Sequence, residues 1–212
     1  MGRPSRRSEL LAAGIEVMHR NGYAGSSVDA IVAMAGMQKG AFFSHFGSKD
    51  AFVREALLAY FQGWSSAADA ILEDEGLSSE GKLEALIRIS TGGSKDNFQF
   101  GCLIGNMAAE MSNSHDEIRK TLTVLFQQWA IPFERLIRKG QALGDFHSGI
   151  DPVATSRFIV NSLQGTILRG KVEHNLQSLE DLIRSLHGLL GLEQPPAGHA
   201  SATPRLRQRR RS

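Results

Sequence analysis

The sequence is poor in cysteine, because Cys102 is the only one in 212 residues. An internal disulfide framework is therefore excluded, and a reducing compartment is expected. The sequence also lacks any run of 18 uninterrupted apolar residues, so we expect no membrane-spanning helix. Its basic N-terminus has no continuous apolar stretch of the kind found in signal peptides. Together these absences predict a cytoplasmic protein without a membrane partner.

Motifs for catalysis and metal binding are missing as well. The sequence contains no phosphate-binding glycine loop, no motif for an activated nucleophile and no cluster of residues at metal-ligand spacing. We therefore predict no catalytic residue, no cofactor and no metal ion. One enzymatic alternative stays open, in which Cys102 is a nucleophile and His115, His147 or His174 is its base.

Strand-like alternation is not sustained anywhere, and apolar residues instead recur at the helical period. The stripes are short in the first 50 residues and longer beyond residue 75, where residues 114–117 predict a capping box. We predict an all-α protein with a three-helix unit at residues 1–50 and a larger antiparallel helical domain at 51–192. Residues 193–212 have little to bury and are expected to form a disordered basic tail.

Basic residues are concentrated at the two ends of the chain. Residues 1–60 carry seven Lys/Arg and five Asp/Glu, and residues 201–212 carry five arginines and no acid. Basic ends attract a phosphate backbone by releasing its counterions. Solvated basic tails are also common, so charge favours a nucleic-acid partner without deciding the question.

Residues 36–49, GMQKGAFFSHFGSK, place aromatic, small and cationic residues in one short helix. This helix follows another short helix after a turn at Gly36, which is the pattern of a helix-turn-helix motif. The second helix of such a motif enters the major groove of DNA. Phe42 and Phe46 are four residues apart and share a core-facing stripe, whereas Phe43 lies about 100° away and points outward. One face of the helix is therefore expected to pack and the other to contact DNA.

The stretch from Gly22 to Leu57 resembles the DNA-binding domain of the TetR family of transcriptional regulators. The resemblance implies that Ser27 and Lys49 contact phosphates, and it implies a reading surface of Gln38, Lys39, Gly40, Ala41, Phe43, Ser44 and His45. Val32 and Phe43 depart from the alanine and tyrosine that are usual in the family. An interior position is the alternative for His45, and a solvated charge is the alternative for Lys39.

The stretch FQFGCLIGNMAAEMS, residues 98–112, resembles a TetR subgroup of repressors that respond to reactive electrophiles or small unsaturated acids. The resemblance implies a small-molecule effector and a sensor role for Cys102. A helix start near Cys102 is expected to lower the thiol pKa, and the alternative is a buried packing residue. Candidate effector-binding residues, for which ordinary core packing is the alternative, are Phe98, Cys102, Asn106, Met107, Phe126, Trp129 and Gln164.

The resemblance also implies a homodimer, formed through helices predicted at residues 151–171 and 178–190. Asp151 and Pro152 are a typical helix start, and small residues such as Gly165 allow helices to approach closely. A symmetric dimer is expected to bind a palindromic double-stranded DNA operator. We predict a repressor that an effector releases through movement of the helix at about residues 48–75. Activation instead of repression stays open, as does an architectural DNA-binding protein without an effector.

Overall fold

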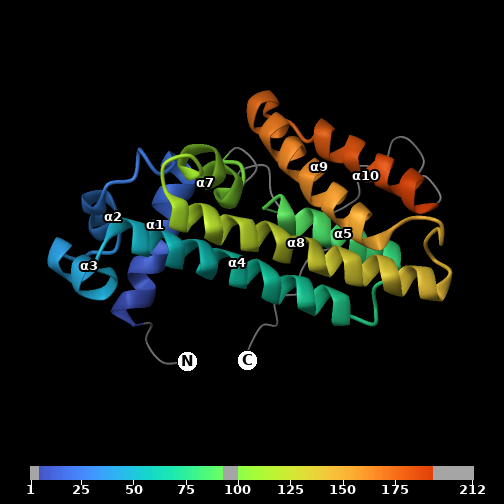
Figure 1. The fold of residues 1–212 in the computed structure, drawn as a ribbon, viewed down its shortest axis with the longest axis horizontal. Helices are drawn as coiled ribbons and strands as arrows, with labels where there is room; N and C mark the ends of the chain where they lie inside the picture. The colour runs from blue at the N-terminus through green and yellow to red at the C-terminus, as the bar shows by residue number, and fades with distance from the viewer. Residues whose placement is uncertain (1–4, 93–99, 193–212) are drawn as a thin grey trace, which may run out of the picture.

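The computed structural model describes residues 5–92 and 100–192, and these residues form nine helices and no strand. The helices, labelled as in Figure 1, are α1 (Arg6–Asn21), α2 (Val28–Met34), α3 (Lys39–Phe46), α4 (Lys49–Glu73), α5 (Ser79–Ser90), α7 (Leu103–Met111), α8 (Asp116–Leu143), α9 (Pro152–Glu173) and α10 (Gln177–Leu190). The predicted all-α fold class is confirmed. Phe98 and the predicted basic tail lie outside the described residues. Within these residues, no helix is both long and apolar enough to cross a membrane.

Helices α1, α2 and α3 form an N-terminal head, residues 5–48, at one end of the molecule (Figure 1). The side chains of Ser27 and Ser48 cap α2 and α4 by accepting hydrogen bonds from backbone N–H groups two or three residues into each helix. Between α2 and α3, Gly36 has a φ of +64°, which residues with a side chain rarely adopt. This turn sets α3 across α2 and completes the predicted helix-turn-helix arrangement.

A cluster of aromatic rings fixes α3 to α4. The rings of Phe42 and Phe46 have centroids 4.9 Å and 4.8 Å from that of Phe52, which lies on α4. Phe52 also packs against α1, where Gly14 leaves space that a Cβ atom would fill. The direction of α3 is therefore tied to the long helix behind it.

Helix α4 runs from the head into the larger domain (Figure 1) and packs against α1 at one end and against α5 and α8 further along. Buried residues on this helix include Phe52, Val53, Leu57 and Phe61. The predicted packing on both sides of this helix is confirmed. Movement of α4 relative to α8 would therefore change the position of the head.

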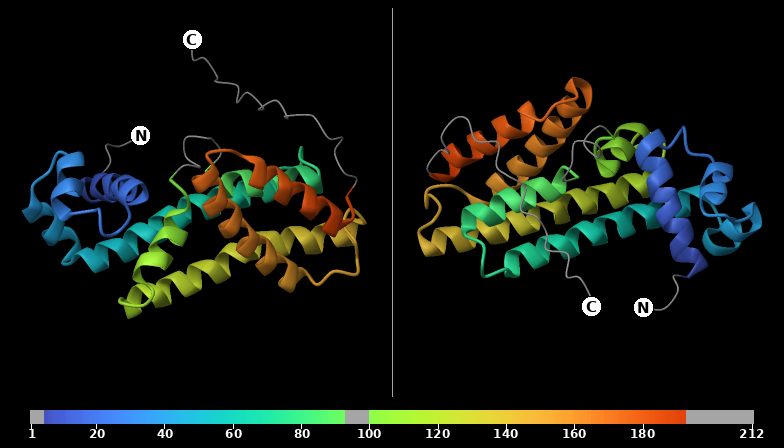
Figure 2. Two further views of the ribbon diagram at one scale, coloured as in Figure 1. Left: turned by 90° about the horizontal axis from the view of Figure 1, so that it is seen from above. Right: turned by 180° about the vertical axis from the view of Figure 1, so that it is seen from behind.

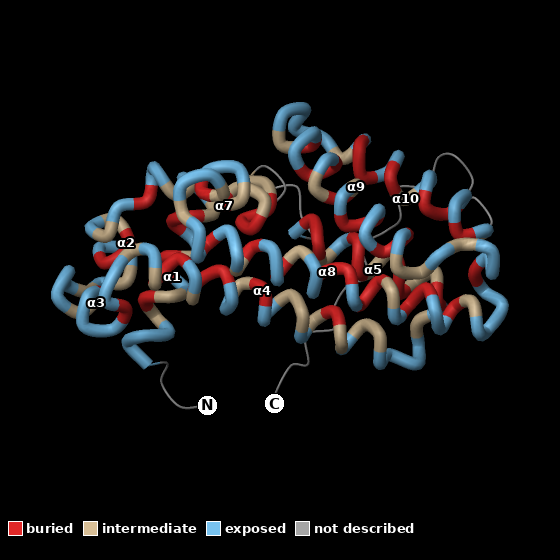
Figure 3. Tube along the Cα trace, in the orientation of Figure 1, coloured by how far each residue is buried: buried red, intermediate tan, exposed pale blue. Residues whose placement is uncertain are grey.

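The larger domain is an antiparallel arrangement of α5, α8, α9 and α10, with α7 between it and the head. Buried positions recur along α4, α8 and α9 with exposed positions between them (Figure 3). The predicted capping box at 114–117 is wrong, because His115 is the N-cap of α8 and its side chain makes no capping bond. The Ser114 hydroxyl contacts the Nδ1 atom of His115 at 2.8 Å instead.

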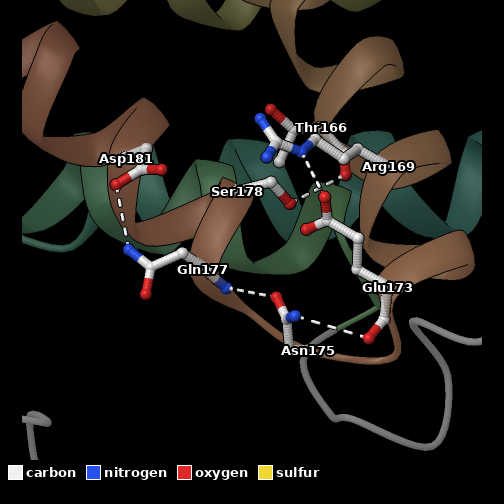
Figure 4. A network of polar contacts seen from close by, with 7 residues as sticks. All are labelled: Thr166, Arg169, Glu173, Asn175, Gln177, Ser178 and Asp181. Atoms are coloured by element: carbon white, nitrogen blue, oxygen red, sulfur yellow. Dashed lines mark hydrogen bonds and ion pairs between the residues drawn. The ribbon is translucent and has the colours of Figure 1, made fainter.

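Helices α9 and α10 lie in the part of the molecule away from the head, and the C-terminal end of α9 reaches back toward the start of α7 (Figure 2). His174 ends α9 in the left-handed conformation, with a φ of 54°. Polar contacts then fix the turn (Figure 4), since the Ser178 hydroxyl donates to the Thr166 carbonyl at 3.2 Å and Asn175 Oδ1 accepts from the Gln177 N–H at 2.9 Å. The predicted pair of helices is present, with boundaries a few residues different from the prediction.

Candidate functional site

The two faces of α3 differ in exposure as the helical period predicts. Phe42 is completely buried and Phe46 is 6% exposed, whereas Phe43 is 45% exposed. His45 is exposed, so the interior position considered for it is wrong. The other predicted reading residues are also at the surface, with Ala41 half-buried and Gln38, Lys39, Gly40 and Ser44 exposed.

Lys39 makes an ion pair within the head. Its Nζ atom lies 3.0 Å from Oδ2 of Asp29 on α2, and both side chains are more than half exposed. An exposed pair of this kind contributes little to stability, so its ammonium group is available to a competing anion. Lys39 therefore has a partner in the free protein and an accessible positive charge on the predicted reading face.

Lys49, which is expected to contact a phosphate, packs against Tyr23 of the head. Its Nζ atom donates to the Tyr23 carbonyl at 2.9 Å and lies 3.8 Å from the centre of the Tyr23 ring. Burial lowers the pKa of Lys49, and the nearby carboxylates of Asp50 and Glu110 oppose that shift. The first turn of α4 also presents backbone N–H groups, which favour anions at a helix N-terminus.

Cys102 is the N-cap residue of α7 and is 5% exposed. Burial raises the pKa of its thiol, although backbone N–H groups of Gly105 and Ile104 and the nearby Gln164 side chain act in the other direction. The expected lowering of this pKa is therefore wrong, because removal from water outweighs the helix N-terminus. The thiol is protonated at neutral pH.

Gln164 reaches Cys102 from α9. Gly105 makes this approach possible, because a Cβ atom at that position would overlap the Gln164 side-chain oxygen. The Gln164 Nε2 atom is buried and has no hydrogen-bond partner of good geometry among the described residues. A buried amide N–H without a partner is costly, so this position favours a ligand that accepts a hydrogen bond.

Tyr60 of α4 completes this region, and the sequence analysis did not identify it. Burial raises the pKa of the Tyr60 hydroxyl, and the proximity of Cys102 raises it further, while the Leu103 backbone N–H lowers it. On its other side, the Tyr60 ring meets the His19 ring of α1 at 5.9 Å. The only feature of the sequence that indicated a buried position for Tyr60 was its place in the broad apolar stripe of α4.

The remaining predicted effector residues serve different parts of the core. Trp129 of α8 and Trp64 of α4 both donate from Nε1 to the Ser90 hydroxyl, at 3.4 Å and 3.1 Å, and Phe126 stacks on Trp129 at 6.3 Å. Met107 is fully buried. The described contacts thus place Trp129 and Phe126 in a junction of α4, α5 and α8.

Asn106 and Glu110 share a face of α7 and have separate roles. The Asn106 amide donates from Nδ2 to the Phe100 carbonyl at 2.9 Å and so supports the turn before the helix. The Glu110 carboxylate accepts hydrogen bonds from the backbone N–H groups of Tyr23 at 3.0 Å and Ala24 at 3.1 Å. Glu110 therefore joins α7 to the loop between α1 and α2.

A second contact joins the start of α7 to the head. The Nε2 atom of His19 on α1 lies 2.7 Å from the carbonyl oxygen of Gly101, next to Cys102. Together with the Glu110 contacts, it fixes both ends of α7 against the head. The region around Cys102 is thus in direct contact with the helix-turn-helix unit.

A helix-turn-helix head with an exposed basic and aromatic face, joined by one long helix to a separate helical domain, defines a DNA-binding transcriptional regulator. Residues 10–56 match the family described as bacterial regulatory proteins, tetR family. Residues 79–186 match the family described as tetracyclin repressor-like, C-terminal domain. The chain belongs to the TetR family of transcriptional repressors, which confirms the resemblance found in the sequence.

Individual relatives agree with this assignment. The chain is 34% identical to the HTH-type transcriptional repressor DhaR of Mycobacterium sp. (strain GP1), over 86% of this chain and 91% of the relative. It is 29% identical to the transcriptional regulator AcuR of Cereibacter sphaeroides, over 83% and 81%. The crystal structure of a TetR regulatory protein from Rhodobacter sphaeroides matches with a TM-score of 0.80 and 28% identity, covering 87% of this chain and 98% of that one.

Proposed function

We propose that the chain is a homodimeric repressor that binds a palindromic operator and is released from it by a small-molecule effector. The observation that carries this proposal is the exposed face of α3, whose opposite face is anchored by Phe42 and Phe46. In this proposal Ser27, Lys49 and the seven predicted reading residues contact DNA. The domains divide near residue 50, and the protein acts in the cytoplasm, where its DNA is found.

An exposed apolar stripe on α9 supports the proposed dimer. Phe158, Leu168 and Val172 are 53%, 65% and 72% exposed, and with Gly165 they recur at helical spacing on one face. Leu189 of α10 is 41% exposed. Large apolar side chains gathered on two adjacent helices are typical of a protein interface. A two-fold dimer through this face would present two reading heads to two half-sites.

We place the effector site beside Cys102, Gln164 and Tyr60. The Gln164 Nε2 atom is buried beside the Cys102 thiol and has no nitrogen or oxygen partner among the described residues, so it can donate a hydrogen bond in an apolar setting of the kind usual in small-molecule sites. Gly101 and Glu110 both contact the head. A ligand that moves α7 would therefore also move the head. The effector must bind the DNA-free conformation more tightly, because otherwise no population shifts.

The effector in this proposal can also be a reactive electrophile that forms a covalent bond with the Cys102 sulfur. The His115 ring lies against Tyr23 and near Asp50, so the contacts described for this histidine do not make it a base for Cys102. We expect N-ethylmaleimide to release wild-type protein from its operator, and we expect Cys102→Ser to bind the operator normally without responding. Equal release of both proteins would remove Cys102 from the mechanism.

A gel-shift assay with the intergenic DNA beside the gene tests operator binding itself. We expect a sequence-specific complex whose affinity falls steeply with salt. Lys39→Ala should weaken binding and reduce the slope of log affinity against log salt by about 1, because one phosphate or base contact is lost. Lys139→Ala, which removes an equal charge at the far end of α8, is the matched control. A complex that does not distinguish this DNA from unrelated DNA would contradict the proposal. If no small molecule tested releases the protein from its operator, an architectural DNA-binding protein would be favoured.

A further inference from the structure

Three ionisable side chains meet where α10 passes α5. These two helices are far apart in the sequence. Glu80 and Glu84 are four residues apart on α5 and so share one face, and His187 lies on α10. The Nδ1 atom of His187 is 3.6 Å from Oε1 of Glu80, and its Nε2 atom is 3.7 Å from Oε1 of Glu84. One potential ligand atom from each residue lies within 4.8 Å of the others.

The imidazole of His187 is unusual because it is completely buried without a hydrogen bond. Its exposed fraction is 0%, and neither ring nitrogen has a hydrogen-bond partner among the described residues. Both nitrogens point at carboxylate oxygens that are beyond hydrogen-bond distance. Buried polar groups are almost always satisfied, so an unpaired imidazole facing two carboxylates requires an explanation.

We propose that Glu80, Glu84 and one ring nitrogen of His187 bind a divalent transition-metal ion of the zinc class, which joins α10 to α5. Two ligands held about 2.1 Å from one zinc ion at the tetrahedral angle are roughly 3.4 Å apart. The two nitrogen–oxygen separations involve different ring nitrogens, so only the one at the nitrogen that binds the ion, 3.6 Å at Nδ1 or 3.7 Å at Nε2, is compared with this value, and either is close to it. The glutamate at the other ring nitrogen, whose ligand atom is within 4.8 Å of the other two, would have to turn toward the same ion.

The charges and exposure of the cluster fit such an ion. Two carboxylates balance a double positive charge, and one nitrogen with two oxygens is a donor set that suits zinc. Arg88 contacts the other oxygen of Glu84, Oε2, at 3.5 Å and leaves Oε1 facing His187. Glu80 and Glu84 are 45% and 31% exposed, so water can reach the site and complete the coordination.

The sequence gives no sign of this metal site, because its ligands are not at short spacing. Here the two glutamates and the histidine are separated by about a hundred residues, and only the fold brings them together. The site lies on helices of the larger domain, so its occupation can be measured without DNA. An ion there would hold α10, one of the helices proposed to form the dimer, in a fixed position against α5.

Isothermal titration calorimetry of zinc chloride into the metal-free full-length chain at pH 7.5 tests the proposal. We expect one saturable site per protomer in the wild type. Glu80→Gln and Glu84→Gln should each weaken that site by at least about tenfold, because each removes one charged ligand. Both glutamates are partly exposed, so these variants should fold. Glu180→Gln, an exposed glutamate on α10, is the matched control and should bind as the wild type does.

Thermal unfolding of the same four proteins provides a second measurement. At a zinc concentration about 100 times the dissociation constant, the melting temperature of the wild type should rise by about 5 °C or more. The rise should be lost in Glu80→Gln and Glu84→Gln and kept in Glu180→Gln. The proposal is overturned if the wild type binds no zinc, or if the two cluster variants bind it as tightly as the wild type.

Discussion

Phe42 and Phe43 are adjacent on α3, yet they belong to different surfaces. Phe42 is completely buried against Phe52, and Phe43 is 45% exposed. Phe42→Ala should lower the free energy of unfolding by about 3–5 kcal/mol, because it leaves a cavity in the head. Phe43→Ala should leave stability within about 0.5 kcal/mol and weaken operator binding. Urea denaturation and fluorescence anisotropy with operator DNA measure the two effects, and a reversal of the two phenotypes would contradict the assignment of faces.

Cys102 should react slowly with alkylating reagents at neutral pH. Burial raises its thiol pKa above the ordinary value, so only a small fraction is thiolate at pH 7. We expect alkylation by iodoacetamide at pH 7 to be more than about tenfold slower in the folded protein than in the urea-unfolded chain. The rate should keep rising with pH beyond the range where an ordinary cysteine levels off. A plateau near pH 7 would indicate a stabilised thiolate and contradict the account.

The sequence predicts the roles of residues well where those roles depend only on their position within one helix. The faces of α3 follow from the helical period alone, and the exposure of Phe43 agrees with it. It predicts them poorly where distant elements contribute. Lys49 is held by Tyr23, 26 residues earlier, and the pKa of Cys102 depends on burial produced by packing between separate helices. Local spacing contains neither kind of information.

Among the helices, α7 contacts the head at both of its ends and carries Cys102 at its start. Glu110→Gln replaces a charged acceptor for the Tyr23 and Ala24 N–H groups with a neutral one. The free energy needed to open the loop between α1 and α2 should fall by about 1 kcal/mol. Amide hydrogen exchange at Tyr23 and Ala24 should therefore become roughly fivefold faster. Hydrogen exchange followed by NMR measures this change.

The control for Glu110→Gln is Glu117→Gln, which removes an exposed carboxylate whose partner, Lys120, lies on the same helix. Exchange at Tyr23 and Ala24 should be unchanged in this variant. If both variants leave exchange as it is in the wild type, Glu110 does not hold the loop. In that case, α1 would still be linked to the start of α7 by the Gly101 carbonyl contact with His19 and by the Phe100 ring, which lies against His19 and Arg20.

Helices were predictable as elements because their apolar stripes are long and regular. The cap at Asp151 was also identified, since an aspartate side chain accepts hydrogen bonds from the first N–H groups of the helix that follows. The capping box before α8 failed because the Ser114 hydroxyl binds the neighbouring imidazole instead of the helix backbone. Competition between a side chain and a backbone N–H for one hydroxyl cannot be resolved from sequence spacing.

At the scale of the whole molecule, the apolar stripe of α9 should hold two protomers together. Leu168→Glu places a charge at the centre of the proposed interface and should convert the dimer to monomer at micromolar concentration in sedimentation equilibrium. Leu143→Glu is the matched control, because Leu143 is 63% exposed and Leu168 is 65% exposed. Dimers that survive Leu168→Glu, or that are lost equally in Leu143→Glu, would place the interface elsewhere.

The arrangement of the whole molecule was predictable in outline, since short helices precede long ones and the head resembles a known family. Contacts between elements far apart in the sequence were not. The link from Glu110 to the head and the meeting of Glu80 with His187 both depend on how helices cross after folding. Neither pair leaves a pattern within any single stretch of sequence.

Selection of binding sites from a random double-stranded DNA library by the full-length protein tests the central claim most directly. The account predicts enrichment of an inverted repeat, bound by two protomers and disrupted by changes in either half-site. It also predicts that Phe43→Ala protein, although folded, enriches the same repeat weakly. The account is contradicted if no sequence is enriched above the starting library, or if the enriched sequence has no two-fold symmetry and binds a single protomer.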